Sequence, residues 1–356
     1  MTPDTPKITV VDHPIAGLGK WFTPFVPRLG LANGHMQTII GSFLPRPAFR
    51  HFAVSETVEV DPADCSRVLC HCHWQPRPIG RLTVLLVHGL EGSSNSRAIL
   101  GIAMRVWDAD YNVVRMNMRN CGDTDGLSPT PYHSGLSDDV GAVVRHYTER
   151  MGLERVAIVG YSMGGNLVLK LAGGGSQPPL CAVAAVCPTI DLAADSDAVH
   201  EPMNRLYEWH FLFGLMRRHR RKAALFPSLY DTSLLWPVFS LREFDDRIIA
   251  RYGGFRDASD YYYRAASARV VDRIAVPTLI LHALDDPFIR LLPETRAALR
   301  ANPQVTLVET RHGGHCAYLS RDPGSEIHWA EATVIRFLLA VTGEAHDPLK
   351  STFQER

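Results

Sequence analysis

The sequence predicts an α/β protein with a mostly parallel, doubly wound sheet of eight strands and an inserted helical cap. From Leu82 onward, short apolar runs alternate with helix-forming segments, as in a sheet covered by helices on both faces. The run Leu82–Val87 is apolar almost throughout, which is typical of a central parallel strand. About 90 residues separate the strand that ends near Cys187 from the one that starts at Thr278. A simple crossover needs only ~10–12 residues, so a cap is expected there.

The strands and the units that they form are expected in a definite order. Strands are predicted at 54–60, 66–73, 82–87, 112–116, 155–159, 180–186, 278–282 and 305–308, the first two as an antiparallel edge pair. The predicted units are an N-terminal arm at 1–50, a core at 51–188 and 262–343, a cap at 189–261 and a polar tail at 344–356. In the arm, which is rich in proline and glycine, Asn33-Gly34-His35 is expected to begin a helix and could also line a cleft.

One motif carries the strongest chemical signal. The β-forming residues 155–159 lead into Gly160-Tyr161-Ser162-Met163-Gly164, and the helix-forming segment 167–172 follows. A serine hydroxyl is a poor nucleophile at neutral pH. Catalysis therefore needs it on a strained strand-to-helix turn, exposed to a base and flanked by glycines where a Cβ would clash. The motif predicts Ser162 as a nucleophile, and the alternative is a tight turn in a glycine-rich chain.

A nucleophile of this type needs an acid and a histidine later in the chain, in that order. Asp285-Asp286 follows the predicted strand 278–282, and His312-Gly313-Gly314-His315 follows the predicted strand 305–308. The three groups would then meet at the carboxyl edge of one sheet, where open α/β sheets place their ligands.

Each position offers two residues of the right type. We predict Asp286 as the acid because it precedes Pro287, where the chain turns toward the histidine loop, and Asp285 as a capping or turn carboxylate. We predict His315 over His312 as the base, because the glycine pair before it can bring it back over the sheet edge. Either residue standing alone would be interpreted as a surface group.

Backbone amides should stabilise the negative charge that develops on the substrate oxygen. The predicted strand 82–87 ends in His88-Gly89-Leu90, a loop suited to this role. We predict the amides of Leu90 and Met163 as the oxyanion donors, and each such donor contributes ~10²–10³ in rate. His88 is predicted to hold the turn by hydrogen bonds.

Composition agrees with a large globular enzyme. The chain has 356 residues, of which 46% are hydrophobic, so it can bury a large core. Lysine plus arginine and aspartate plus glutamate both number 37, so no net charge points to nucleic acid. The first 19 residues lack a charged region that leads into an apolar one, and a cytoplasmic location is therefore expected.

The seven cysteines are scattered along the chain. Cys70-His71-Cys72-His73 resembles a metal-binding cluster in composition. In a strand, however, alternation sends the two cysteines to one face and the two histidines to the other. We therefore predict no metal site.

The predicted cap begins with an aromatic and apolar segment, 207–216, and a basic segment, 217–222, follows it directly. This pairing could make a peripheral contact with a membrane or a phospholipid headgroup. We favour the alternative, a cap helix whose basic end is a solvated face that complements the helix dipole. Trp209, Phe211, Leu212 and Phe213 are expected to roof an acyl pocket.

Seven motifs between residues 33 and 315 match one known family. They are Asn33-Gly34-His35-Met36-Gln37-Thr38-Ile39, His88-Gly89-Leu90-Glu91-Gly92-Ser93, Asn117-Met118-Arg119-Asn120-Cys121-Gly122, Tyr132-His133-Ser134-Gly135, Gly160-Tyr161-Ser162-Met163-Gly164-Gly165-Asn166, Asp285-Asp286-Pro287-Phe288 and His312-Gly313-Gly314-His315. In these motifs the chain resembles the α/β-hydrolase superfamily, and within it the YheT-like group of bacterial hydrolases related to abhydrolase-domain lipases. The resemblance implies an α/β-hydrolase fold and a Ser-Asp-His carboxylic-ester hydrolase that uses no cofactor. Members of the superfamily also include ester-forming acyltransferases.

The function predicted from these residues is hydrolysis of short- to medium-chain acyl esters. Ser162, Asp286 and His315 would act through an acyl-enzyme, and the partner would be a small-molecule ester. One alternative is an acyltransferase, which resolves the same acyl-enzyme with an alcohol. A second is a non-catalytic binding module on a hydrolase fold, and the intact set of three residues argues against it.

Overall fold

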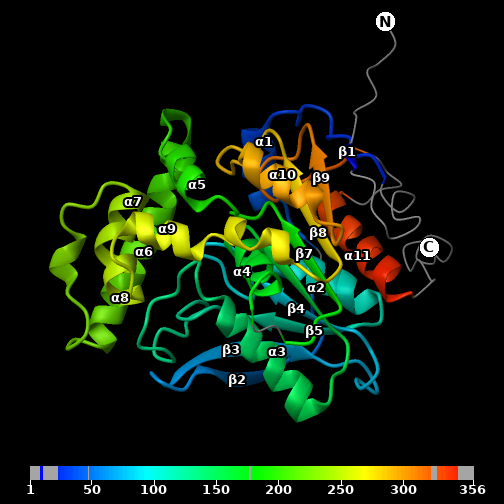
Figure 1. Cartoon of the computed structure of the whole chain (residues 1–356), viewed down its shortest axis with the longest axis horizontal. Coiled ribbons are helices and arrows are strands. Elements are labelled where there is room, and N and C mark those ends of the chain that lie inside the picture. The colour runs from blue at the N-terminus through cyan, green and yellow to red at the C-terminus, as the bar shows by residue number, and fades with distance from the viewer. Residues whose placement is uncertain (1–8, 11–22, 47, 176–177, 322–326, 344–356) are drawn as a thin grey trace, which may run out of the picture.

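A computed structural model describes residues 9–10, 23–46, 48–175, 178–321 and 327–343 (Figure 1). The predicted polar tail at 344–356 lies outside the described residues, as do 1–8 and 11–22 of the predicted arm. One mixed sheet runs through the described chain, with helices packed on both faces. The predicted α/β class is confirmed.

The sheet has nine strands in the order β1-β9-β8-β7-β6-β4-β5-β3-β2. Their bounds are β1 (Thr9–Val10), β2 (Val54–Asp61), β3 (Ser66–His73), β4 (Thr83–Val87), β5 (Asn112–Met116), β6 (Val156–Tyr161), β7 (Ala182–Val186), β8 (Thr278–Ala283) and β9 (Val305–Thr310). The eight predicted strands are all present, and their ends lie within two residues of the predicted ones. The ninth, β1, was not predicted, because two residues are too few to show a period.

Strand direction fixes where a site can form. The six strands β4 to β9 pair in parallel, whereas β1, β2 and β3 pair antiparallel. The chain winds outward from β4 to β5 in one direction and from β6 to β9 in the other. The switch point therefore lies between β4 and β6, and the carboxyl ends of these strands lead to His88 and Ser162.

Two apolar layers enclose the sheet. Leu85 and Val87 of β4 belong to one buried cluster with α3 and α4, whereas Val84 and Leu86 belong to the other with α2 and α11. The helices outside the segment between β7 and β8 are α1 (Gly34–Phe43), α2 (Arg97–Asp108), α3 (Ser137–Met151), α4 (Met163–Ala172), α10 (Pro293–Ala301) and α11 (Trp329–Thr342). Alternation along each strand thus supplies both faces, as a doubly wound sheet requires.

Helices fill the long segment between β7 and β8, where the cap is predicted. They are α5 (Leu192–Val199), α6 (Arg205–Leu225), α7 (Leu241–Phe244), α8 (Arg251–Gly253) and α9 (Ala258–Ala265). In Figure 1 α6, α7 and α8 stand to one side of the sheet. The bounds 189–261 for a separate cap unit stay a prediction. Helix α9 continues across the predicted C-terminal bound at residue 261.

The basic segment at the end of α6 is only partly a solvated face. Lys222 is buried and donates to Asn120 Oδ1 over 3.1 Å, and Arg218 Nε donates to Glu91 Oε1 over 3.1 Å. Burial lowers the pKa of Lys222 to about 8. Two of the cations therefore hold α6 against the core, whereas Arg217 and Arg220 are exposed, and a membrane contact of this segment stays a prediction.

Candidate active site

Ser162 stands on a strained turn between β6 and α4. Its φ of 53° and ψ of −120° are rare for a residue with a side chain. A Cβ on Gly160 would lie 2.2 Å from Gly164 O, and one on Gly164 would lie 2.4 Å from Val87 O. Both motif glycines are therefore required by backbone packing, and the turn matches the predicted nucleophile elbow.

The structure brings the three predicted side chains together. His315 Nε2 lies 2.9 Å from Ser162 Oγ, and His315 Nδ1 lies 2.8 Å from Asp286 Oδ2. An ionised carboxylate only accepts, so Nδ1 donates to Asp286 and Nε2 is left to accept the proton of the serine hydroxyl. Phe288 covers the imidazole, with 4.3 Å between ring centroids.

Asp286 is held as a buried, ionised group. Its second oxygen, Oδ1, accepts from the amides of Phe288 and Ile289, each over 3.1 Å. Burial acts to raise the pKa of Asp286, but the charge and hydrogen bond of His315 and the Phe288 amide outweigh burial and lower it. The carboxylate is therefore suited to orienting the imidazole.

The other aspartate and histidine form a separate pair. Asp285 Oδ1 accepts from the amide of Gly314 over 2.9 Å, and its Oδ2 lies 3.4 Å from His312 Nδ1. Burial raises the pKa of Asp285. Asp285 thus fastens the loop that carries His315, which agrees with its predicted role as a turn carboxylate.

Helix α1 supports the same loop, a role that the sequence did not predict. Asn33 caps α1 by accepting from Met36 N over 3.1 Å, so the expected helix start is present. Thr38 Oγ1 accepts from His315 N over 2.8 Å. A Cβ on Gly34 would lie 1.8 Å from Asp285 O. The signal was present in the motif at 33–39, but its partner lies in a loop far along the chain.

The predicted oxyanion loop lies against the elbow. A Cβ on Gly89 would lie 3.0 Å from Ser162 Cβ, which places the Leu90 peptide beside the serine. His88 is buried, with Nδ1 2.8 Å from Gly89 O and Nε2 3.1 Å from Met118 N. The ring therefore donates to Gly89 and accepts from Met118 as a neutral imidazole, and it holds the turn as predicted.

Two pairs of cysteines lie near histidines and bear on metal binding. Cys70 and Cys72 lie in one core cluster, whereas the ring of His73 contacts Phe49, which packs against the other, so strand alternation separates them as predicted. Among the described residues, Cys187, Cys316 and His315 place ligand atoms within 4.8 Å of one another. Thiols and an imidazole suit a soft metal ion. In this structure both imidazole nitrogens contact Asp286 and Ser162 instead.

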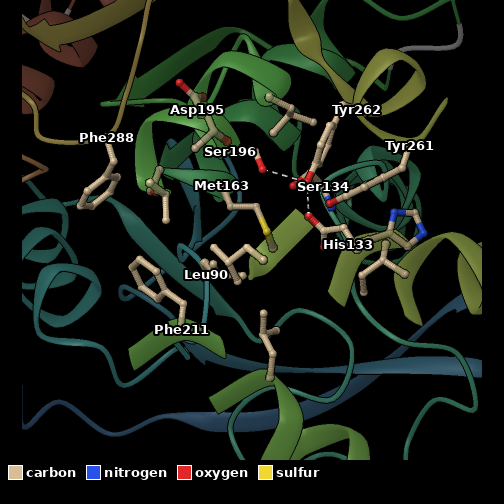
Figure 2. A pocket seen from close by; sticks show the side chains of 18 of the residues that line it. Leu90, His133, Ser134, Met163, Asp195, Ser196, Phe211, Tyr261, Tyr262 and Phe288 are labelled. Carbon is tan, nitrogen blue, oxygen red and sulfur yellow. Dashed lines mark hydrogen bonds between the residues drawn. The ribbon is translucent and has the colours of Figure 1, made fainter. Parts of the chain in front are cut away.

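Two cavities meet at Ser162, and Leu90, Phe211 and Phe288 line both. The smaller encloses about 790 Å³, including its open part, and is mainly apolar. Figure 2 shows it between Phe211 and Phe288 on one side and Tyr261 and Tyr262 on the other. The larger encloses about 1580 Å³, including its open part, and reaches His315. Two parts of a substrate bound at Ser162 can therefore extend into different cavities.

The predicted acyl roof is only partly correct. Phe211 and Leu215, four residues apart on α6, line the smaller cavity. Leu212 is buried in the core cluster, while Trp209 and Phe213 are exposed. The prediction was wrong for Trp209 and Phe213, because one helix turns neighbouring residues to different sides.

Comparison with known proteins agrees with this geometry. Residues 83–322 match the sequence family described as the alpha/beta hydrolase fold. YheT of Escherichia coli K12 is 32% identical over 323 residues, which cover 87% of this chain and 91% of YheT. The chain belongs to the α/β-hydrolase family. The predicted family and its YheT-like group are thus confirmed.

Other α/β hydrolases resemble the chain more distantly. Phospholipase ABHD3 of Mus musculus is 29% identical over 75% of this chain and 66% of its own length. Monoacylglycerol lipase of Saccharomyces cerevisiae is 26% identical over 72% and 58%, respectively. The Pyrococcus furiosus esterase Pf2001 shares the fold, with a TM-score of 0.52 and 15% identity over 83% of this chain and 97% of that one. The protein is an esterase- or lipase-like enzyme, as predicted.

Helix length and hydropathy give one further finding. Within the described residues, no helix combines the length and the apolar character that crossing a bilayer requires.

Burial of neutral His88 predicts loss of stability in acid. Burial lowers its pKa from 6.5 to about 4 in the folded protein. Between these two pKa values the unfolded chain binds a proton on this imidazole and the folded chain does not. The free energy of unfolding therefore decreases as pH falls from 6.5 toward 4. Between pH 7.5 and pH 5 the loss should be on the order of 2 kcal/mol. Urea unfolding of wild type and His88→Asn at both pH values measures it. A difference between the two proteins that does not shrink at pH 5 would contradict the neutral, buried imidazole.

Proposed function

We propose that the protein hydrolyses carboxylic esters of short- to medium-chain acyl groups by a Ser162-His315-Asp286 triad. The observation that carries the proposal is the unbroken contact from Ser162 Oγ through the imidazole to Asp286, at 2.9 and 2.8 Å. The strained elbow and the adjacent loop after β4 support it, because the loop approaches Ser162 closely enough for backbone amides there to serve as oxyanion donors.

The proposed reaction has two halves. Ser162 Oγ attacks the ester carbonyl while His315 Nε2 takes its proton, and the ionised Asp286 stabilises the resulting imidazolium. The amides of Leu90 and Met163 donate to the oxyanion. His315 returns the proton to the departing alcohol, which leaves an acyl-enzyme. A water then attacks that ester while His315 takes its proton, the bond between Ser162 Oγ and the acyl carbon breaks, His315 returns the proton to Oγ, and the acid product leaves.

The two cavities divide the substrate. The smaller cavity would hold the acyl chain, and the larger one, which also contacts His315, would admit the alcohol part. The same arrangement favours a second candidate function, acyl transfer. With the acyl chain in the smaller cavity, an alcohol can reach Ser162 through the larger one and replace water. The ratio of ester to acid formed from one acyl donor at rising alcohol concentration distinguishes the two.

Location and partners are also part of the proposal. We infer a cytoplasmic enzyme that acts on small-molecule esters and does not bind nucleic acid. Equal numbers of acidic and basic residues, 37 of each, support the last point. Cell fractionation with an antibody to the full chain tests the location.

Replacing triad residues should separate their roles. Ser162→Ala should lower kcat for p-nitrophenyl acetate by ~10⁶ and leave thermal unfolding nearly unchanged. Asp286→Asn should lose ~10⁴ in kcat, because the amide favours the wrong tautomer of His315. Asp285→Asn is the matched control and should lose far less. A larger loss in Asp285→Asn than in Asp286→Asn would move the acid by one residue.

The size of the smaller cavity should determine the preferred acyl chain length. Each buried methylene contributes ~0.8 kcal/mol, so kcat/KM should rise about fourfold per carbon and then stop when the cavity is full. Leu215→Phe fills part of the cavity and should move the optimum to shorter chains. Leu225→Phe, on the exposed end of α6, is the control. A series of p-nitrophenyl esters measures this. A wild-type optimum at acetate, or an unchanged profile in Leu215→Phe, would assign the acyl chain elsewhere.

A further inference from the structure

An exposed apolar surface borders the larger cavity. On α6 and the turn before it, Leu206 is 75% exposed, Phe213 68% and Trp209 56%. On α1, Phe43 is 71% exposed. The α1–α6 face, as we name it, consists of Met36, Ile39, Phe43, Met203, Leu206, Trp209 and Phe213, all exposed. An exposed apolar patch of this kind marks an interaction site.

The two helices form one continuous surface around the mouth of the larger cavity. The ring of His35 on α1 stacks on Tyr207 of α6, with centroids 5.9 Å apart and an angle of 16°. Ile39, Phe43 and His210 are exposed and also line the cavity, so they lie at its mouth. The cavity extends from there to Ser162 and His315. The face therefore surrounds an entrance to the catalytic serine.

Cationic side chains continue the exposed stripe of α6. Leu206, Trp209 and Phe213 follow one another at spacings of three and four residues, and Arg217 and Arg220 extend the same series. All five therefore lie on one side of the helix, and both arginines are exposed. An apolar stripe with adjacent arginines fits a lipid surface that carries negative charge.

We propose that the α1–α6 face docks on an anionic lipid bilayer, with the mouth of the larger cavity against the lipid. The inference rests on the proposed ester hydrolysis and names its substrate class as esters of membrane-resident lipids. Such a substrate can pass from the bilayer to Ser162 without exposing its apolar part to water. The contact differs from the one considered for the whole basic segment, because Arg218 and Lys222 are buried against the core, whereas Arg217 and Arg220 are exposed.

Vesicle sedimentation of the full chain tests the docking. Ser162→Ala protein is mixed with vesicles of phosphatidylglycerol and phosphatidylcholine, or of phosphatidylcholine alone, so that binding is measured without turnover. The protein should prefer the anionic vesicles. Trp209→Ser with Phe213→Ser should lower partitioning by roughly tenfold or more. Arg217→Gln with Arg220→Gln should lower it by about fivefold per charge and weaken its dependence on salt.

Ile79→Ser is the matched control. Ile79 is 67% exposed and precedes β4, so it lies toward the amino ends of the parallel strands, away from the catalytic edge. Its loss should leave vesicle binding unchanged. For activity measurements Ser162 is kept, and Trp209→Ser with Phe213→Ser is compared with wild type. The variant should hydrolyse soluble p-nitrophenyl acetate at the wild-type rate, but a long-chain ester in anionic vesicles at least tenfold more slowly than wild type.

Three results would overturn the docking. They are absence of vesicle binding by the parent protein, equal binding of the Trp209→Ser, Phe213→Ser variant, and a dimer in light scattering that this variant abolishes. The last would show that a second copy covers the face. Vesicle binding with no hydrolysis of any ester would support the docking and refute the proposed function, so the two failures are distinguishable.

Discussion

The close approach of two backbone segments at the switch point constrains the rest of the site. The turn from β6 into α4 lies so near the end of β4 that a Cβ on Gly164 would sit 2.4 Å from both Val87 O and His88 O. Ser162 avoids such a clash but adopts a strained φ, which costs about 1–3 kcal/mol. The sheet holds it there, because Ser162 N donates to Val186 O over 2.9 Å. The nucleophile and the loop after β4 are therefore positioned by the same packing.

The histidine loop is supported from outside the sheet. His315 N donates to Thr38 of α1, and Gly314 N donates to Asp285 at the end of β8. The segment before β2 is thus structural to the site, and α1 also forms one side of the larger cavity. One helix in this way connects the orientation of His315, the proposed general base, with the entrance through which we propose that a lipid ester arrives.

Sequence patterns predicted what depends on local spacing. The strand, the turn and the helix around Ser162 are contiguous, and Asp286 and His315 each follow a clear apolar strand. The missed features depend on contacts between distant segments. Thr38 and His315 are separated by 277 positions, and Lys222 and Asn120 by 102. Composition alone made 217–222 look like a solvated or lipid-facing segment. Lys222 is buried because it contacts the loop that contains Asn120, which is distant in the sequence.

Covalent labelling of the nucleophile tests the central claim most directly. Treatment of the native protein with a fluorophosphonate, followed by mass spectrometry of its peptides, should find a single adduct on Ser162. His315→Ala should slow the labelling strongly, because the hydroxyl then has no base to accept its proton. An adduct on a different serine, or none on a protein that still hydrolyses esters, would contradict the triad.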